Sequence, residues 1–319
     1  MNSTTGAASA YGISVEQEPI GHHKTRHTLT LLLRARRCPF ECVFCDLWLH
    51  NHASATPVGS IPSQISDAIE QTFSRDPYRG TVPREPRWAI KLYNGGNFTD
   101  PLSVPETDWT AIADRCKPFD RVIVENHATM CGSRLLKFQE QLRPRLEVAI
   151  GLETANVDVL SRQQKKMTLS DFDRAAKFVL DHGMDLRCFT MLQLPYSDVK
   201  CSVDDSIATV QHAVGAGALF VAIIPTRHTT KAMQSLVRSG DHQPPNLRQL
   251  ERALFESLRW TSEMKSDAVV IADTWDIDHV DHCSACQRHT IANIQAMNAA
   301  QRPCAISSCQ SCGTEACDR

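Results

Sequence analysis

The sequence predicts an α/β protein, built as a partial (β/α)6 barrel with a small cysteine-rich C-terminal extension. Short apolar stretches alternate with amphipathic helical stretches between residues 29 and 224, which is the pattern of βα units. Several of the apolar stretches are uninterrupted, as expected of parallel strands that are buried on both faces. With 319 residues, 42% of them hydrophobic, the chain is long enough for one large domain with an appendage.

The predicted elements follow one another as strand and helix. Strands are expected at residues 29–33, 88–93, 121–125, 146–152, 186–194 and 219–224, and helices at 62–73, 107–116, 135–142, 169–182 and 203–216. Beyond these, a long helix at 247–264 and a short strand at 268–272 precede a cysteine-rich tail. We therefore expect a flexible N-terminal segment over 1–24, a barrel core over 25–226 and an extension over 227–319.

The charge balance leaves the class of partner open. A net charge of −2 neither requires nor excludes a nucleic acid, because a chain that relies on its overall charge to bind phosphates is more basic. Contact with RNA would use local patches, of which Arg34, Arg36 and Arg37, and Lys165 with Lys166, are candidates. An ordinary solvated surface is the alternative interpretation of each patch.

The cysteine content indicates a compartment. The N-terminus lacks the basic start and apolar stretch of a signal peptide, and no stretch approaches 18 apolar residues, so we expect no membrane association. Thirteen cysteines without a secretory signal favour metal ligands in a reducing cytoplasm over a disulfide scaffold.

Three closely spaced cysteines carry most of the functional interpretation. Cys38, Cys42 and Cys45 form a C-x3-C-x2-C motif directly after the first predicted strand. Three thiolates at this spacing can bind three irons of a 4Fe–4S cluster and leave the fourth iron open to a small molecule. A structural zinc site, the main alternative, usually has four ligands, and the next cysteine is Cys116. Chemistry gathers where barrel strands end, so the position suits a cluster.

Further candidate residues stand at the ends of later strands. Asn94, Gly95 and Gly96 follow the second strand, and glycines there allow the backbone to approach a ligand closely. Glu153 ends the fourth strand, and its carboxylate can accept hydrogen bonds from both hydroxyls of a ribose. Arg187 lies on the fifth strand. A plain glycine turn, a helix N-cap and a buried ion pair are the respective structural alternatives.

The cysteine motif, with Phe44 just before its third cysteine, resembles that of the radical S-adenosylmethionine (radical SAM) enzymes. The stretch Leu146–Asn156 is similar to a distinctive stretch of the archaeosine-biosynthesis radical SAM family, within the group that contains the elongator catalytic subunit, MiaB and NifB. Residues 124–126, 244–247 and 281–286 fit the same branch, so the resemblance spans roughly residues 28–295.

The resemblance implies cofactors and their ligands. A 4Fe–4S cluster on the three cysteines would reductively cleave S-adenosylmethionine to a 5′-deoxyadenosyl radical. The family pattern assigns the methionine amino group to Asn94, Gly95 and Gly96, the ribose to Glu153 and shielding of the cluster to Phe44. Arg187 is a candidate to neutralise the methionine carboxylate, with an ion pair to a barrel glutamate as the alternative. The sequence departs from the pattern at Asn97, where the family often has a glutamate.

The resemblance also implies a substrate and partners. In the family, a partner attaches lysine to a 7-cyano-7-deazaguanine base of tRNA, and the radical enzyme then cleaves the adduct. We therefore expect a tRNA, a deazaguanine-transferase-like protein and an electron donor of the flavodoxin or ferredoxin type as partners. A radical SAM enzyme for a small molecule or peptide is the alternative, followed by a non-enzymatic zinc-binding interaction protein.

The tail contains a second group of cysteines with a different spacing. Cys283 with Cys286, and Cys309 with Cys312, form two C-x2-C pairs, the usual arrangement of a structural zinc site. Three further interpretations are a site that uses the first pair with histidines such as His279 or His282, a second iron–sulfur cluster, and a disordered end over the last ten residues. Cys304 and Cys317 lie near these pairs.

Overall fold

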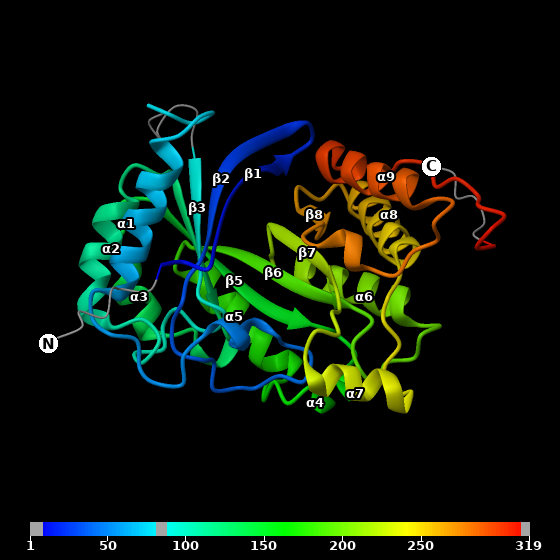
Figure 1. The fold of residues 1–319 in the computed structure, drawn as a ribbon, viewed down its shortest axis with the longest axis horizontal. Coiled ribbons are helices and arrows are strands. Elements are labelled where there is room, and N and C mark those ends of the chain that lie inside the picture. Colours follow the sequence, from blue (N-terminus) through cyan, green and yellow to red (C-terminus); the bar gives the residue numbers. More distant parts are fainter. Residues whose placement is uncertain (1–8, 81–87, 314–319) are drawn as a thin grey trace, which may run out of the picture.

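The computed structural model describes residues 9–80 and 88–313, and these form one curved sheet with helices packed on its outer side (Figure 1). Within these residues the sheet has eight strands in the order β1 to β8. Strand β1 is antiparallel to β2, and every later neighbour is parallel. The strands are β1 (Gly12–Gly21), β2 (Lys24–Leu32), β3 (Trp88–Tyr93), β4 (Arg121–Asn126), β5 (Arg145–Glu153), β6 (Asp185–Leu192), β7 (Phe220–Pro225) and β8 (Val269–Ala272).

The helices connect successive strands and cover the outside of the sheet. They are α1 (Ser60–Phe73), α2 (Trp109–Cys116), α3 (Ser133–Gln139), α4 (Val157–Arg162), α5 (Leu169–Asp181), α6 (Ser202–Gly215), α7 (Lys231–Ser239), α8 (Leu247–Glu263) and α9 (Gln287–Ala300). Helices α1 to α3 gather on one side in Figure 1, and α8 with α9 cover the other. The main apolar core lies between this helical layer and the sheet.

Local sequence explains the well-formed helices. Helix α5 begins with a reciprocal capping box between Thr168 and Asp171, which satisfies two backbone donors at the helix start. Its buried side includes Phe172 and Val179, at the seven-residue spacing that keeps side chains on one helix face. Helix α8 begins with an equivalent box between Asn246 and Gln249.

The predicted fold class is confirmed: the sheet is a nearly closed, barrel-like sheet of the α/β type, with its C-terminal cysteine region in place. The expected boundary at residue 226 does not end the sheet. Strand β8, which the sequence places in the extension, pairs with β7 as a seventh parallel strand. The first and last strands, β1 and β8, approach each other, so the extension contributes to the barrel.

The prediction of a flexible segment over residues 1–24 is wrong for residues 12–21, which form β1 and pair along β2 through a tight turn at His22 and His23. The physical reason lies far away in the sequence. Glu18 on β1 is 3% exposed and forms ion pairs with Lys91 of β3 and Arg187 of β6. A local pattern cannot reveal a strand that is fixed by partners on distant strands.

Among the described residues, no helix has the length and apolar character needed to cross a membrane.

Candidate cluster and cofactor site

The C-x3-C-x2-C loop lies at the carboxyl end of β2, where it meets the ends of β3, β4 and β5. Cys38, Cys42 and Cys45 are all partly buried, and the Cys45 amide donates to the Cys42 carbonyl at 3.1 Å. Each thiol influences another electrostatically, so the three lie in one region. The structure therefore brings the three predicted ligands together at the strand ends.

The chemistry of this loop fits an iron–sulfur cluster. Burial raises the pKa of the Cys42 thiol to about 11 and that of Cys45 to about 12, so a bound cation is needed to stabilise the thiolates. Backbone amides near Phe40 and Leu47 favour the thiolates of Cys38 and Cys45, and such N–H···S contacts tune clusters. Within the described residues, these thiols do not form a group tight enough for a single ion.

Two asparagines connect the cysteine loop to the end of β3. The Asn51 side chain accepts from the Ala35 amide at 3.2 Å and donates to the Asn94 carbonyl at 2.9 Å. The Asn97 amide group contacts the Cys38 sulfur at 3.5 Å, and its Oδ1 accepts from the His127 amide at 2.6 Å. Asn97 therefore supports the loop in a position where the family pattern often has a glutamate.

The glycines after β3 allow the cysteine loop to pack against this strand end. A Cβ at Gly96 would lie 3.2 Å from the Cβ of Cys38. Gly95 has a φ of +61°, and a Cβ there would lie 2.8 Å from Nδ2 of Asn51. Glycine suits position 96 because a side chain there would lie too close to Cys38. It suits position 95 because of both the positive φ and the close approach of Asn51.

We expect Gly96→Ala to bind less cluster iron while the barrel stays folded, because the added methyl group would lie 3.2 Å from the Cys38 Cβ and shift this ligand by a few tenths of an ångström. Overpacking of this kind costs about 1–3 kcal/mol. Gly215→Ala, at the end of α6 with open space around its Cβ, is the matched control and should keep full iron content. Iron analysis and circular dichroism after anaerobic reconstitution check this. Normal iron content in Gly96→Ala would contradict the proposed packing.

Two carboxylates stand at neighbouring strand ends. Burial raises the pKa of Glu125 to about 7, although amides of Asn94, Gly95 and Gly96 favour its charged form. The Gly95 amide donates to Glu125 Oε2 at 3.0 Å. The like charge of Glu153 also raises the pKa of Glu125. A bound ammonium group beside Glu125 would relieve this unfavourable burial.

Glu153 ends β5 in a left-handed conformation, with a φ of +69°. Its Oε1 lies 2.8 Å from Nζ of Lys165, and both side chains are almost completely buried. The charge of Lys165 also lowers the pKa of Cys42. Lys165 was expected as half of a surface patch for RNA, which is wrong, because it is 7% exposed. The position of Lys165 beside the cysteines could not be predicted from the sequence, because no local motif surrounds this residue.

Arg187, predicted as a cofactor ligand, forms the ion pairs that were its structural alternative. The guanidinium binds Glu18 at 2.7 and 2.9 Å and Glu147 at 2.5 Å. Arg187 pairs in register with Ala149, four residues before Glu153 on β5, which corresponds to about 13 Å of strand. Arg187 therefore stabilises the part of the barrel interior that lies away from the carboxyl ends of the strands and the cysteine loop.

The other expected residues have mixed positions. Phe44 is partly buried, while the aromatic stack of the loop is made by Phe40 on His127, with ring centroids 3.7 Å apart.

The three arginines expected as an RNA patch have partners within the protein. Arg34 donates to the His50 carbonyl, Arg36 pairs with an aspartate, and Arg37 donates to a backbone carbonyl.

A pocket of about 450 Å³ opens beside the cysteine loop, at the ends of β7 and β8. We call it the mouth pocket; its lining includes Arg227, His228, Thr229, Trp275 and Asp281. The Thr229 hydroxyl donates to Oδ2 of Asp46, the residue after Cys45, at 2.7 Å. Trp275 is 50% exposed. An exposed aromatic face can stack a flat ring, while Arg227 pairs with Asp273 at 3.9 Å.

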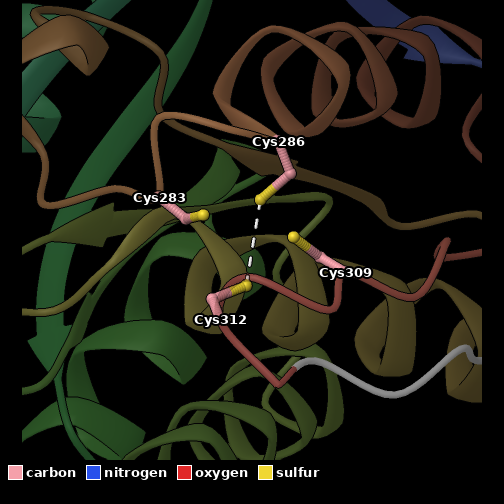
Figure 2. Close-up of side chains that lie close together, drawn as sticks. All are labelled: Cys283, Cys286, Cys309 and Cys312. Carbon is pink, nitrogen blue, oxygen red and sulfur yellow. Dashed lines mark hydrogen bonds between the residues drawn. The ribbon is translucent and has the colours of Figure 1, made fainter.

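The tail cysteines form a second and separate group. The sulfur atoms of Cys283, Cys286, Cys309 and Cys312 all lie within 4.8 Å of one another, and Figure 2 shows the four side chains converging. Of the histidine alternatives, His282 is exposed and contacts the Val280 carbonyl. The side chain of His279, and Cys317, lie outside the described residues.

Comparison with known proteins adds distant relatives. An uncharacterized protein of Methanocaldococcus jannaschii is 20% identical over 257 residues, which cover 77% of this chain and 68% of the relative. The archaeosine synthase subunit beta of Methanosarcina acetivorans is 20% identical over 302 residues, covering 88% of this chain and 81% of the relative. No family model matches the chain.

Among solved structures, the archaeal Elp3 of Methanocaldococcus infernus, with an N-terminal deletion, has a similar fold. It superposes with a TM-score of 0.51 at 12% identity, over 74% of this chain. The chain spans 58% of the length of that structure. The barrel architecture of the chain is therefore similar to that of this structure.

Proposed function

We propose that the protein is an enzyme that binds a 4Fe–4S cluster through Cys38, Cys42 and Cys45 and reductively cleaves S-adenosylmethionine. The observation that carries this proposal is the position of the three-cysteine loop. It is packed on Gly96 at the carboxyl ends of the strands, where buried carboxylates and backbone amides gather. When bound, the cluster and S-adenosylmethionine together supply a 5′-deoxyadenosyl radical.

The residues of this chain hold and orient the cofactors. Glu125 is suited to accept the amino group of methionine, because its half-buried carboxylate lies near the end of β4 and already accepts a hydrogen bond from the Gly95 amide at 3.0 Å. Glu153 is suited to the ribose, and its carboxylate is held in place by Lys165, whose Nζ lies 2.8 Å from Oε1. The loop and the mouth-pocket segment are connected through Asp46 and Thr229, which would limit water entry to the reacting centre.

The proposed substrate is a tRNA carrying a deazaguanine base. Two curated relatives are named archaeosine synthase subunit beta, and their designation as subunits supports a partner protein, proposed here to be deazaguanine-transferase-like. The exposed Trp275 with Arg227 and His228 in the mouth pocket offers stacking and charge to an unstacked base, the usual mode of RNA recognition outside duplexes. The proposed electron donor is a flavodoxin or ferredoxin.

The substrate is tested by adding candidates to the reduced, reconstituted enzyme and measuring 5′-deoxyadenosine by mass spectrometry. We expect tRNA that carries a lysine-modified deazaguanine to accelerate its formation and to be converted. Unmodified transcript and free deazaguanine nucleoside serve as controls. Acceleration by the free nucleoside alone would instead favour the small-molecule alternative. Zinc without iron after anaerobic purification would favour a non-enzymatic zinc protein.

A further inference from the structure

The tail cysteines lie apart from the proposed catalytic loop and have a geometry of their own. Cys283 and Cys286 stand at the start of α9, and Cys309 and Cys312 lie in the segment that follows it. Cys286 and Cys312 have their sulfur atoms 3.9 Å apart, which is too far for a disulfide bond of about 2.05 Å. Figure 2 shows that the sulfur atoms face a common centre.

We propose that these four cysteines bind one zinc ion, and that this ion fixes the wall of the mouth pocket. A Zn–S bond of about 2.3 Å places the sulfur atoms of a regular tetrahedron about 3.8 Å apart. The observed limit of 4.8 Å therefore needs only a small contraction around one ion. A 4Fe–4S cluster holds its thiolates farther apart, because the cube of iron and sulfide lies between them.

Zinc is favoured over iron at a site with room for one ion. Tetrahedral thiolate sites bind Zn²⁺ more tightly than Fe²⁺. Four protein ligands also leave no open position, which is typical of a structural site. Binding replaces the thiol protons, which are released to solvent.

The surroundings balance the charge of such a site. Four thiolates and one Zn²⁺ carry a net charge of about −2. The Gln287 amide at the start of α9 donates to the Cys283 carbonyl at 3.0 Å. The N-terminus of α9, which is the positive end of its helix dipole, therefore lies beside the cysteines. Arg248 of α8, which pairs with Glu251 at 2.6 Å, also interacts electrostatically with Cys286. The same guanidinium donates to the Ser307 carbonyl at 2.7 Å, so it links α8, α9 and the tail.

The tail is positioned next to α8 and α9 by further contacts. Asn293 of α9 donates to Glu251 of α8 at 2.8 Å and to the Ala305 carbonyl at 3.3 Å. Ile306 is 4% exposed and belongs to the main core. These contacts hold Cys309 and Cys312 opposite the first pair, so the site is largely preorganised.

The proposed ion is connected to the mouth pocket through one short segment. Residues 273–282 lie between β8 and Cys283, and Trp275, Asp276, Val280 and Asp281 from this segment line the pocket. The Leu247 amide donates to the Asp281 carbonyl at 2.8 Å. Zinc would therefore fix one end of the segment while β8 fixes the other. This functional consequence rests on the proposed function, whereas zinc binding does not.

Metal analysis of the full-length chain tests the site. After anaerobic purification with added Zn²⁺, we expect about one zinc per chain in the wild type. We also expect it in the Cys38→Ala/Cys42→Ala/Cys45→Ala variant, which has no cluster site. Cys309→Ser/Cys312→Ser should lose the zinc and keep the cluster iron. Cys312→His should retain zinc, because Cys3His is also a zinc ligand set. Cys201→Ala, an exposed cysteine elsewhere, is the control.

A second measurement uses only folded wild-type protein. Removal of zinc with a chelator should increase hydrogen exchange in residues 273–286 and leave β3 to β5 unchanged. Three results would overturn the proposal: wild type without zinc, zinc retained by Cys309→Ser/Cys312→Ser, or extra iron that this variant loses. Because the cluster-free variant still reports zinc, failure of this proposal and failure of the radical chemistry are separate outcomes.

Discussion

Replacing Cys38, Cys42 and Cys45 together with alanine should abolish both cluster iron and formation of 5′-deoxyadenosine. The three thiols lie in one partly buried loop at the strand ends, and no other group of cysteines in the described part of the chain faces Glu125 and Glu153. Without its ligands the cluster cannot form, so the expected effect is complete loss of activity rather than a reduced rate. Iron analysis, visible absorption and product analysis measure it.

The control is Cys201→Ala, whose exposed thiol should be dispensable for both iron and activity. Circular dichroism must show that the triple variant is folded. We expect it to be, because the barrel core lies between sheet and helices and away from the loop. Radical formation by a folded triple variant would rule out the assigned ligands.

Replacing Arg187 with methionine should destabilise the protein by about 3–5 kcal/mol, because removal of one partner leaves buried charges uncompensated. Arg187 is 2% exposed and pairs with Glu18 and Glu147, both almost completely buried. Urea unfolding measures the change. Lys177→Met, which breaks an exposed ion pair with Asp181, should change stability by about 0.5 kcal/mol or less. Equal stability of both variants would contradict the role of the buried network.

The pH dependence of the Arg187 effect has a defined direction. Burial alone would raise the pKa of Glu18, but Arg187 and Lys91 outweigh burial and hold that pKa well below its usual value. Its contribution is therefore present above the unfolded pKa of about 4.5 and is lost as the pH falls below it. We expect the difference between wild type and Arg187→Met to shrink in acid, and a difference that grew there would reverse this assignment.

Periodicity predicts the parallel sheet well, because each strand is a short apolar stretch and each main helix has a one-sided apolar pattern. Two elements, β1 and α9, are exceptions, because residues far away in the sequence stabilise both. Strand β1 carries Glu18, which becomes favourable inside the barrel only when Lys91 and Arg187 surround it. Helix α9 was not predicted, and its apolar face becomes evident only where Ile294 and Met297 enter the core.

In the candidate site too, local motifs predict some residues, while contacts between distant parts of the chain position the others. Motif spacing predicts the cysteine loop and the glycines after β3, because the constraint on them is local. Spacing also identifies the tail cysteine pairs, while their convergence depends on α8 and α9. Spacing does not reveal the ion pairs of Arg187, since the side chain direction and depth of a residue on a strand depend on register with its neighbours. The role of Lys165 could not be predicted locally, because it depends on the chain after α4 folding next to Cys42.

The most direct test of the central claim is product analysis of the wild-type protein after anaerobic reconstitution and reduction with dithionite. With S-adenosylmethionine added, we predict 5′-deoxyadenosine and methionine in equal amounts. Intact S-adenosylmethionine after reduction, in protein whose Cys38, Cys42 and Cys45 demonstrably hold a cluster, would contradict the account.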